Sequence, residues 1–286
     1  MPARLFLVIV ACLALGGCAN GLFYQPNHVV YQTPERHHLT YTNVVFHSAD
    51  GTPLTGWFIP AVGPPLGTVV HLHGNAQNMT AHFSFVDWLP AERFNVFVFD
   101  YRGYGQSAGS PDRKHLYEDS LAALQYVATR PDVDPQRLLV LGQSLGGANA
   151  IAVLARHDFP GVRAIVIDST FSSYRTIVRD KIALIPILSL LRWPLSFVVV
   201  SNGYSPDAGV KRLPHVPVLF IHGTADTVIP FQHGKTLFAL ANEPKQFWIV
   251  DKGNHTDALT RFRRQYAPLL VDFFNQALEA NAEESK

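Results

Sequence analysis

The sequence predicts an α/β fold in which helices cover both faces of a mostly parallel sheet. Three observations lead to this prediction: short, continuously apolar segments recur along the chain, amphipathic segments of helical length separate them, and glycine-rich turns follow some of them. Strands that are apolar along their whole length are buried on both faces, which is typical of parallel sheets. In such sheets, catalytic and ligand-binding residues lie at the carboxyl ends of the strands.

About eight strands are expected. The first two, 42–47 and 54–59, flank Asp50 and Gly51, a dipeptide typical of hairpin turns, so they should pair antiparallel. The other six should belong to the parallel part of the sheet, and they are 68–73, 95–100, 138–141, 164–168, 218–222 and 247–250.

Helices are expected between these strands. Their predicted ranges are 80–89, 112–130, 144–156 and about 257–280. The second of them follows Ser110 and Pro111 and is followed by Pro131, which are ordinary start and stop signals.

Composition narrows the classes of function. A chain of 286 residues can bury one sizeable core, and its 48% hydrophobic and 16% charged residues are typical of globular proteins. The formal net charge of +1 gives no reason to expect a nucleic-acid partner. Cys12 and Cys18 are the only cysteines, which excludes a thiolate metal site and a cysteine nucleophile from the folded part. No H-E-x-x-H motif occurs, so no metal is expected.

The N-terminal residues have the pattern of a targeting segment. A weakly basic start precedes the apolar run 5–15, which has signal-peptide length and is too short to span a bilayer. Leu15-Gly16-Gly17-Cys18 then resembles the bacterial lipobox, which implies a signal peptide over 1–17 and a lipidated Cys18. A common signal peptide cut nearby and a plain N-terminal anchor are the alternatives. Residues 18–38 are expected to form a polar tether before a domain that spans 39–286.

Residues 142–146, Gly-Gln-Ser-Leu-Gly, match the pattern G-x-S-x-G. Ordinary glycine and serine frequencies give this pattern by chance in roughly one chain in ten of this length, so the match alone is a modest signal. Its place between a strand and a helix is typical of a nucleophile elbow, where glycines permit the sharp turn. The helix N-terminus adds a positive partial charge below the seryl oxygen. We therefore predict that Ser144 is a nucleophile.

A seryl nucleophile needs a general base, and the base needs an orienting carboxylate. Asp226 and His255 each follow an expected strand, and with Ser144 they give the chain order serine, acid, histidine. Asp168 is the rival acid, because it ends the strand that follows the elbow. Asp226 is preferred because the turn HG-x-x-D would direct its carboxylate toward the loop that carries His255.

Acyl transfer also needs hydrogen-bond donors for the oxyanion. The backbone N–H of Leu145, which follows the nucleophile, is expected to supply one donor. The backbone N–H of Asn75, in the HGN turn after a central strand, is expected to supply the other. His73 and His222 stand in HG pairs at strand ends and are expected to brace loops through hydrogen bonds.

One segment, about 171–205, breaks the alternation of strands and helices. It contains the apolar run IALIPILSLLRWPLSFVVV, which Pro186, Arg192 and Pro194 interrupt. Prolines and a central charge are costly within a membrane span. We therefore expect a small helical cap over the active site, with an ordinary long helix packed on the sheet as the alternative.

Six stretches together resemble the α/β-hydrolase superfamily, and most closely its abhydrolase-domain serine hydrolases, many of which are bacterial lipoproteins. These stretches are DGTPLTGWFIPA, HLHGNAQN, FDYRGYGQSAGSPD, LGQSLGG, VLFIHGTADTVIP and GNHTD. The resemblance implies the α/β-hydrolase fold, a triad of Ser144, Asp226 and His255, and no cofactor. The segment 171–205 matches no motif of the family.

The resulting expectation is a lipid-anchored serine hydrolase that cleaves carboxylic esters through an acyl-enzyme. Its substrate would be a small or lipid-like acyl compound, since the cap segment is apolar. The same triad could instead cleave amides or thioesters or support perhydrolysis, and a non-catalytic binding lipoprotein of the envelope is an alternative of another class. Ala19 stands where lipoproteins retained in the inner membrane often have Asp, so the resemblance favours the outer membrane, facing the periplasm.

Overall fold

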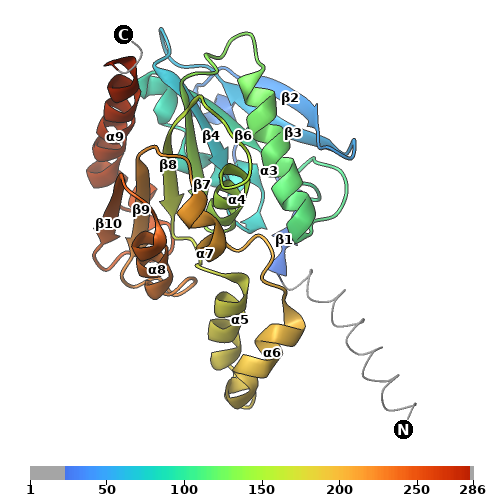
Figure 1. Cartoon of the computed structure of the whole chain (residues 1–286). Helices are drawn as coiled ribbons and strands as arrows, with labels where there is room; N and C mark the ends of the chain where they lie inside the picture. Colours follow the sequence, from blue (N-terminus) through green and yellow to red (C-terminus); the bar gives the residue numbers. More distant parts are fainter. Residues whose placement is uncertain (1–22, 284–286) are drawn as a thin grey trace.

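The computed structural model describes residues 23–283 (Figure 1). Its main sheet has eight strands in the order β10-β9-β8-β7-β4-β6-β3-β2. The strands are β2 (Thr42–His47), β3 (Pro53–Ile59), β4 (Gly67–Leu72), β6 (Phe94–Phe99), β7 (Leu138–Gln143), β8 (Val162–Asp168), β9 (Val218–Gly223) and β10 (Lys245–Val250). The helices are α2 (Met79–His82), α3 (Arg113–Ala128), α4 (Leu145–Leu154), α5 (Tyr174–Ala183), α6 (Arg192–Val199), α7 (Pro206–Gly209), α8 (Gln232–Leu240) and α9 (Arg263–Glu283).

The strand pattern confirms the predicted α/β fold. β2 pairs with β3, and β3 with β6, in antiparallel register, while every other pair in this sheet is parallel. The central strands β4, β6 and β7 are buried along their whole length, as their apolar sequences require.

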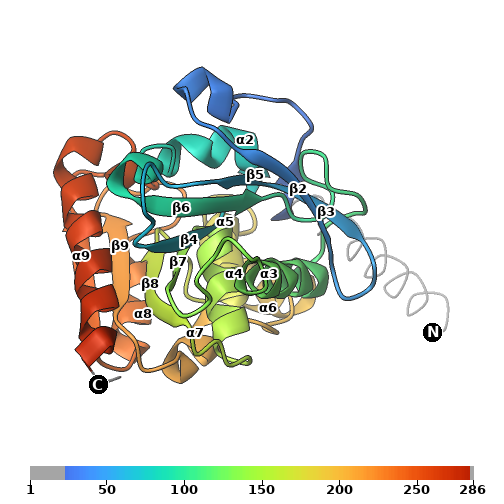
Figure 2. The same ribbon diagram turned by 90° about the horizontal axis from the view of Figure 1, so that it is seen from above.

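Two hydrophobic cores lie on opposite faces of the sheet. One joins Val70 and Val140 of the sheet to Ile151 of α4, and the other joins Val69 to Phe83 and Phe274. Viewed from above, α3 and α4 lie on one side of β4 and β6, and α2 lies on the other (Figure 2). The sheet is thereby covered on both faces, and its loops are positioned by packed elements.

Two helix predictions differ from the structure, and one helix was not predicted. The helix expected at 80–89 is wrong: α2 ends at His82, and two 3₁₀ turns, Phe83–Phe85 and Leu89–Glu92, follow it. Phe83, Val86 and Leu89 are all buried, and their spacing of three residues suits the tighter 3₁₀ period. The C-terminal helix begins at Arg263, after a 3₁₀ turn, and α8 was not predicted.

The described part of the expected tether, residues 23–38, packs against the domain. Its strand β1 (Gln25–Pro26) pairs with β5 (Ala76–Gln77), and the Tyr31 N–H donates a hydrogen bond of 3.0 Å to Thr80 Oγ1. The Tyr24 ring is buried in the core next to α3. The tether prediction is therefore wrong from residue 23 onward, because aromatic burial holds this segment. The predicted signal peptide and Cys18 lie outside the described residues.

The segment 171–205 is helical in pieces, as predicted. It forms α5, a 3₁₀ turn at Ser189–Leu191 and α6, so the alternative of one long helix on the sheet is wrong. The two helices pack against each other and extend away from the carboxyl ends of the strands (Figure 1).

Candidate active site

Ser144 occupies a strained turn between β7 and α4. Its φ of 52° and ψ of −113° are a backbone conformation that residues other than glycine rarely adopt. A Cβ on Gly146 would lie 1.9 Å from the Leu72 carbonyl oxygen, and a Cβ on Gly142 would lie 2.6 Å from Gly147 Cα. The sharp turn therefore requires glycine at both positions, as the sequence pattern predicts.

Neighbouring strands hold the strained turn in place. The Ser144 N–H donates to the carbonyl oxygen of Asp168 at 2.8 Å. The Ser144 carbonyl oxygen accepts from Thr170 Oγ1 at 3.1 Å and from the Ala148 N–H at 3.3 Å. These bonds offset the strain and fix where the hydroxyl sits, at the carboxyl end of β7.

Asp226 and His255 lie together at the same edge of the sheet. His255 Nδ1 is 2.8 Å from Asp226 Oδ2, and Asp226 Oδ1 accepts hydrogen bonds of 2.8 Å from the N–H groups of Val228 and Ile229. Burial raises the pKa of Asp226, but hydrogen bonds from His222 and His255 outweigh it and hold the pKa well below its usual range. Because the ionised carboxylate can only accept, it fixes the proton on Nδ1 and leaves Nε2 as the basic nitrogen.

The rival acid, Asp168, has different partners. Its carboxylate accepts from Gln143 Nε2 at 3.2 Å and from Ser169 Oγ at 2.9 Å. His71 Nε2 lies 2.8 Å from Gln143 Oε1, and the Thr256 N–H donates to Ser169 Oγ at 3.1 Å. This buried chain of polar groups runs across three strands and ends beside His255. It makes Asp168 a support for the histidine loop, whereas Asp226 makes the direct contact.

Burial acts on the two ends of this chain in opposite ways. It raises the pKa of the Asp168 carboxyl, and it lowers the pKa of His71 to about 3. His71 is therefore neutral at physiological pH.

The HGN turn lies beside the serine. A Cβ on Gly74 would be 3.7 Å from Ser144 Cβ. The side chain of Asn75 donates to the Phe23 carbonyl oxygen, and the Tyr104 hydroxyl donates to the Asn75 carbonyl oxygen at 2.9 Å. Asn75 is thereby held from two sides, and Leu145 is the first residue of α4. Both N–H groups expected to bind the oxyanion belong to segments that meet at Ser144.

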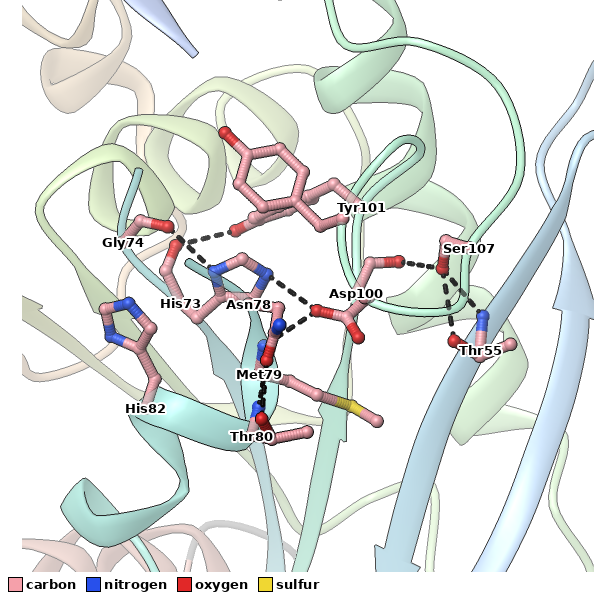
Figure 3. A network of polar contacts seen from close by, with 12 residues as sticks. Thr55, His73, Gly74, Asn78, Met79, Thr80, His82, Asp100, Tyr101 and Ser107 are labelled. Carbon is pink, nitrogen blue, oxygen red and sulfur yellow. Dashed lines mark hydrogen bonds and ion pairs between the residues drawn. The ribbon is translucent and has the colours of Figure 1, made fainter. Parts of the chain in front are cut away.

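His73 braces the HGN turn, as expected, but the buried network with Asp100 to which it belongs was not anticipated from the sequence (Figure 3). His73 Nδ1 donates to the Gly74 carbonyl oxygen at 2.7 Å, and its Nε2 is 3.5 Å from Asp100 Oδ1. Asp100 also accepts from the Met79 N–H at 2.7 Å, and the Tyr101 hydroxyl donates to the His73 carbonyl oxygen at 3.1 Å. The network ties the HGN turn to the end of β6 and the start of α2.

Burial disfavours charge on both ionisable groups of this network. It raises the pKa of Asp100 to about 7 and lowers the pKa of His73 well below its usual value. The only sequence signal for Asp100 is an aspartate that ends a buried strand, in the stretch FDYRGYG. His222 braces a loop in the same manner as His73, through a 2.8 Å contact of Nε2 with the Ile229 carbonyl oxygen.

No group of three or more His, Cys, Asp or Glu side chains within residues 23–283 is arranged to hold a metal ion. This edge of the sheet presents a buried carboxylate, an imidazole and a strained seryl hydroxyl.

Comparisons with known proteins place the chain among hydrolases. Residues 63–212 match the family model described as serine aminopeptidase, S33. The chain is 42% identical to the uncharacterized protein YfhR of Salmonella typhi, over 96% of this chain and 94% of that protein. It is 33% identical to the alpha/beta hydrolase domain-containing protein WAV2 of Arabidopsis thaliana, over 79% of this chain and 75% of that protein.

Among solved structures, the esterase Pf2001 of Pyrococcus furiosus is similar with a TM-score of 0.73 and 22% identity. The match covers 89% of this chain and 98% of that chain. At this identity the likeness establishes the fold, and it agrees with the strand order described above.

Proposed function

The chain belongs to the serine aminopeptidase S33 family of α/β hydrolases, and from this premise we propose that it is a serine hydrolase that cleaves carboxylic esters. One observation carries the proposal: the hydrogen-bonded pair Asp226 and His255 lies at the sheet edge where Ser144 stands on a glycine-bounded elbow. The similarity to an esterase of the same fold supports an ester as the substrate.

In the proposed reaction, Ser144 Oγ attacks the acyl carbon while His255 Nε2 takes the hydroxyl proton. The ionised Asp226 stabilises the imidazolium that forms. The N–H groups of Leu145 and Asn75 bind the oxyanion, and His255 returns the proton to the leaving alcohol. Water then attacks the acyl-enzyme with His255 again as base, which releases the acid and restores the hydroxyl of Ser144.

The proposal includes an anchor. Lipidation of Cys18 would attach several acyl chains to one residue, which holds a protein stably on a membrane where one chain does not. The lipobox-like residues 15–18 support an envelope location, with the outer membrane favoured by Ala19.

A fluorophosphonate probe tests the nucleophile. Wild type should be labelled, Ser144→Ala should not, and Ser110→Ala, which changes an exposed serine, should label like wild type. Labelling that persists in Ser144→Ala would refute the assignment. A folded wild type that neither labels nor turns over any substrate would instead support a binding protein.

A substrate panel tests the bond that is cleaved. Esters of increasing acyl length, thioesters and aminoacyl amides should be compared by kcat/KM. Preference for aminoacyl amides over every ester would replace the esterase proposal with an amidase of the same triad.

A further inference from the structure

Helices α5 and α6, with the turn between them, form a projection that we call the α5–α6 hairpin (residues 174–199). Among residues 23–283, 17 large apolar side chains are exposed, and ten of them belong to this hairpin. Ile187 and Leu190, near its tip, are 89% and 90% exposed. Soluble monomers rarely expose apolar surface in such a concentrated patch, and patches of this kind mark docking surfaces.

The base of the hairpin, in contrast, is packed. Tyr174, Ile177 and Val178 of α5 are buried, as are Ser196 of α6 and Val200 just beyond it. An ordered base therefore holds the apolar tip away from the domain, and the exposure of the tip follows from the shape of the fold.

The charges of the hairpin are mostly positive. It contains four basic residues and one acidic residue, Asp180, which pairs with His233 at 2.8 Å. The guanidinium of Arg175 lies 4.4 Å from the ring centre of Phe197, and that of Arg179 lies 4.1 Å from the ring of Trp193. Arginines and aromatic rings that flank an apolar tip are the pattern of helices at the interface of an anionic bilayer.

The described chain begins at the foot of the same hairpin. The Phe23 ring lies 5.7 Å from the ring of Tyr174, the first residue of α5. Phe23 and Val199 also line one cavity of about 330 Å³. Cys18 precedes Phe23 by five residues, which reach at most about 18 Å when extended. An acyl chain on Cys18 would therefore bring the bilayer to this side of the domain.

We infer that the α5–α6 hairpin docks the protein on a phospholipid bilayer with anionic headgroups. The apolar tip enters the acyl boundary, and the arginines lie among the headgroups. None of the helices within residues 23–283 combines the length and apolar character needed to cross a bilayer. The inferred contact lies at the bilayer interface, because the arginines flank the apolar tip, and it involves none of the residues of the proposed serine chemistry.

One contact connects the hairpin to the candidate active site, and a second connects it to α8. Lys181 Nζ donates to the carbonyl oxygen of Val228 at 2.6 Å, and Asp180 holds His233. The Val228 N–H in turn donates to the Asp226 carboxylate. Because the hairpin extends from the carboxyl ends of the strands, docking through it would turn the edge of the sheet that carries Ser144 toward the lipid surface (Figure 1).

Vesicle flotation tests the inference without the N-terminal anchor. The chain from Ala19 onward retains every described element and lacks both the apolar run 5–15 and Cys18. It should float with vesicles of phosphatidylcholine and phosphatidylglycerol in equal parts, and bind less to phosphatidylcholine alone or in high salt. The double variant Ile187→Ser/Leu190→Ser should bind about tenfold more weakly, because burial of each apolar side chain contributes to binding.

The matched control removes the same kind of surface elsewhere. Val45→Ser/Val62→Ser changes two side chains that are 64% and 63% exposed and lie outside the hairpin, so it should bind like wild type. Melting temperatures establish that both variants are folded. Ser144→Ala should bind vesicles like wild type, so that a failure of the hydrolase proposal is seen separately, by probe labelling.

Three results would overturn the inference. Wild type could fail to float with either vesicle, or the two double variants could lose binding equally. Alternatively, wild type could form a dimer that Ile187→Ser/Leu190→Ser disrupts, without vesicle binding, which would make the tip a contact between copies of this chain.

Discussion

The elbow region around Ser144 and the α5–α6 hairpin differ in the kind of side chain that each buries and exposes. Around Ser144, polar groups are buried and bonded to partners on several strands, and glycines stand where a side chain would strike the backbone. In the hairpin, apolar side chains are exposed, and buried side chains are confined to the base. Catalysis requires atoms in fixed positions, and internal packing fixes them around Ser144. The hairpin instead exposes apolar surface that the rest of the domain does not cover. The predictions below test how far this division holds.

The largest effect is expected at the acid. Asp226→Asn should lower kcat for ester hydrolysis by ~10⁴-fold, because an amide no longer holds the imidazole in the tautomer with Nε2 free. Steady-state kinetics on a soluble ester measure the change. Asp251→Asn, which alters an exposed aspartate beyond β10, should leave kcat near the wild-type value. If Asp168→Asn lost more activity than Asp226→Asn, the acid would have to be reassigned.

A second prediction concerns the packing of the elbow. Gly146→Ala should lower the free energy of unfolding by about 3 kcal/mol, because its Cβ meets the rigid Leu72 carbonyl oxygen at 1.9 Å. Gly203→Ala is the matched control: its Cβ would find only Ser201 Oγ, at 4.0 Å, so the change should stay within about 0.5 kcal/mol. Urea unfolding measures the stability of both variants. If both lost the same free energy of unfolding, the elbow would be no more tightly packed than the foot of the hairpin.

Features that are determined by local sequence patterns could be predicted from the sequence. The eight strands, the elbow glycines and the strand-end positions of Asp226 and His255 follow from apolar runs and motif spacing, and the structure brings these two side chains within 2.8 Å. These features depend on a few neighbouring residues. They are therefore visible in one chain without knowledge of its packing.

Features that depend on distant partners could not be predicted in this way. Asp100 meets His73 and Met79 only because β6, β4 and α2 converge at one point. Tyr24 looks like part of a polar tether until the core beside α3 buries it. The run 182–200 is apolar on nearly all sides, so its periodicity cannot separate the buried Val200 from the exposed Ile187.

A third prediction uses the buried carboxyl group under the HGN turn. The pKa of Asp100 is raised to about 7 in the folded state, compared with roughly 3.9 for an unfolded aspartate. Between these values the folded state binds more protons, so this group makes the free energy of unfolding fall as pH rises. Asp100→Asn should remove this contribution to the slope of unfolding free energy against pH.

Urea unfolding at a series of pH values measures this slope. The stability of wild type relative to Asp100→Asn should decrease from about pH 4 to about pH 7 and then level off. Because the comparison is a difference, other titrating groups largely cancel. A constant difference across this range would show that Asp100 is ionised throughout.

The smallest effect is expected at the tip of the hairpin. In solution, Ile187→Ser/Leu190→Ser should change the free energy of unfolding by no more than about 0.5 kcal/mol, because neither side chain is covered by the domain. Ile177→Ser, at the buried base, should cost roughly 2 kcal/mol or more through a cavity and an unpaired hydroxyl. Urea unfolding without lipid measures both.

The contrast between these two variants is informative because both replace large aliphatic side chains with serine, at exposed positions in one and at a buried position in the other. A tip variant as unstable as the base variant would mean that the tip packs against the domain or another copy in solution. In that case its apolar surface would not be available to a membrane. If the tip can be made polar without loss of stability, its apolar side chains do not contribute to folding. Their exposure is then explained by binding to a partner outside the chain.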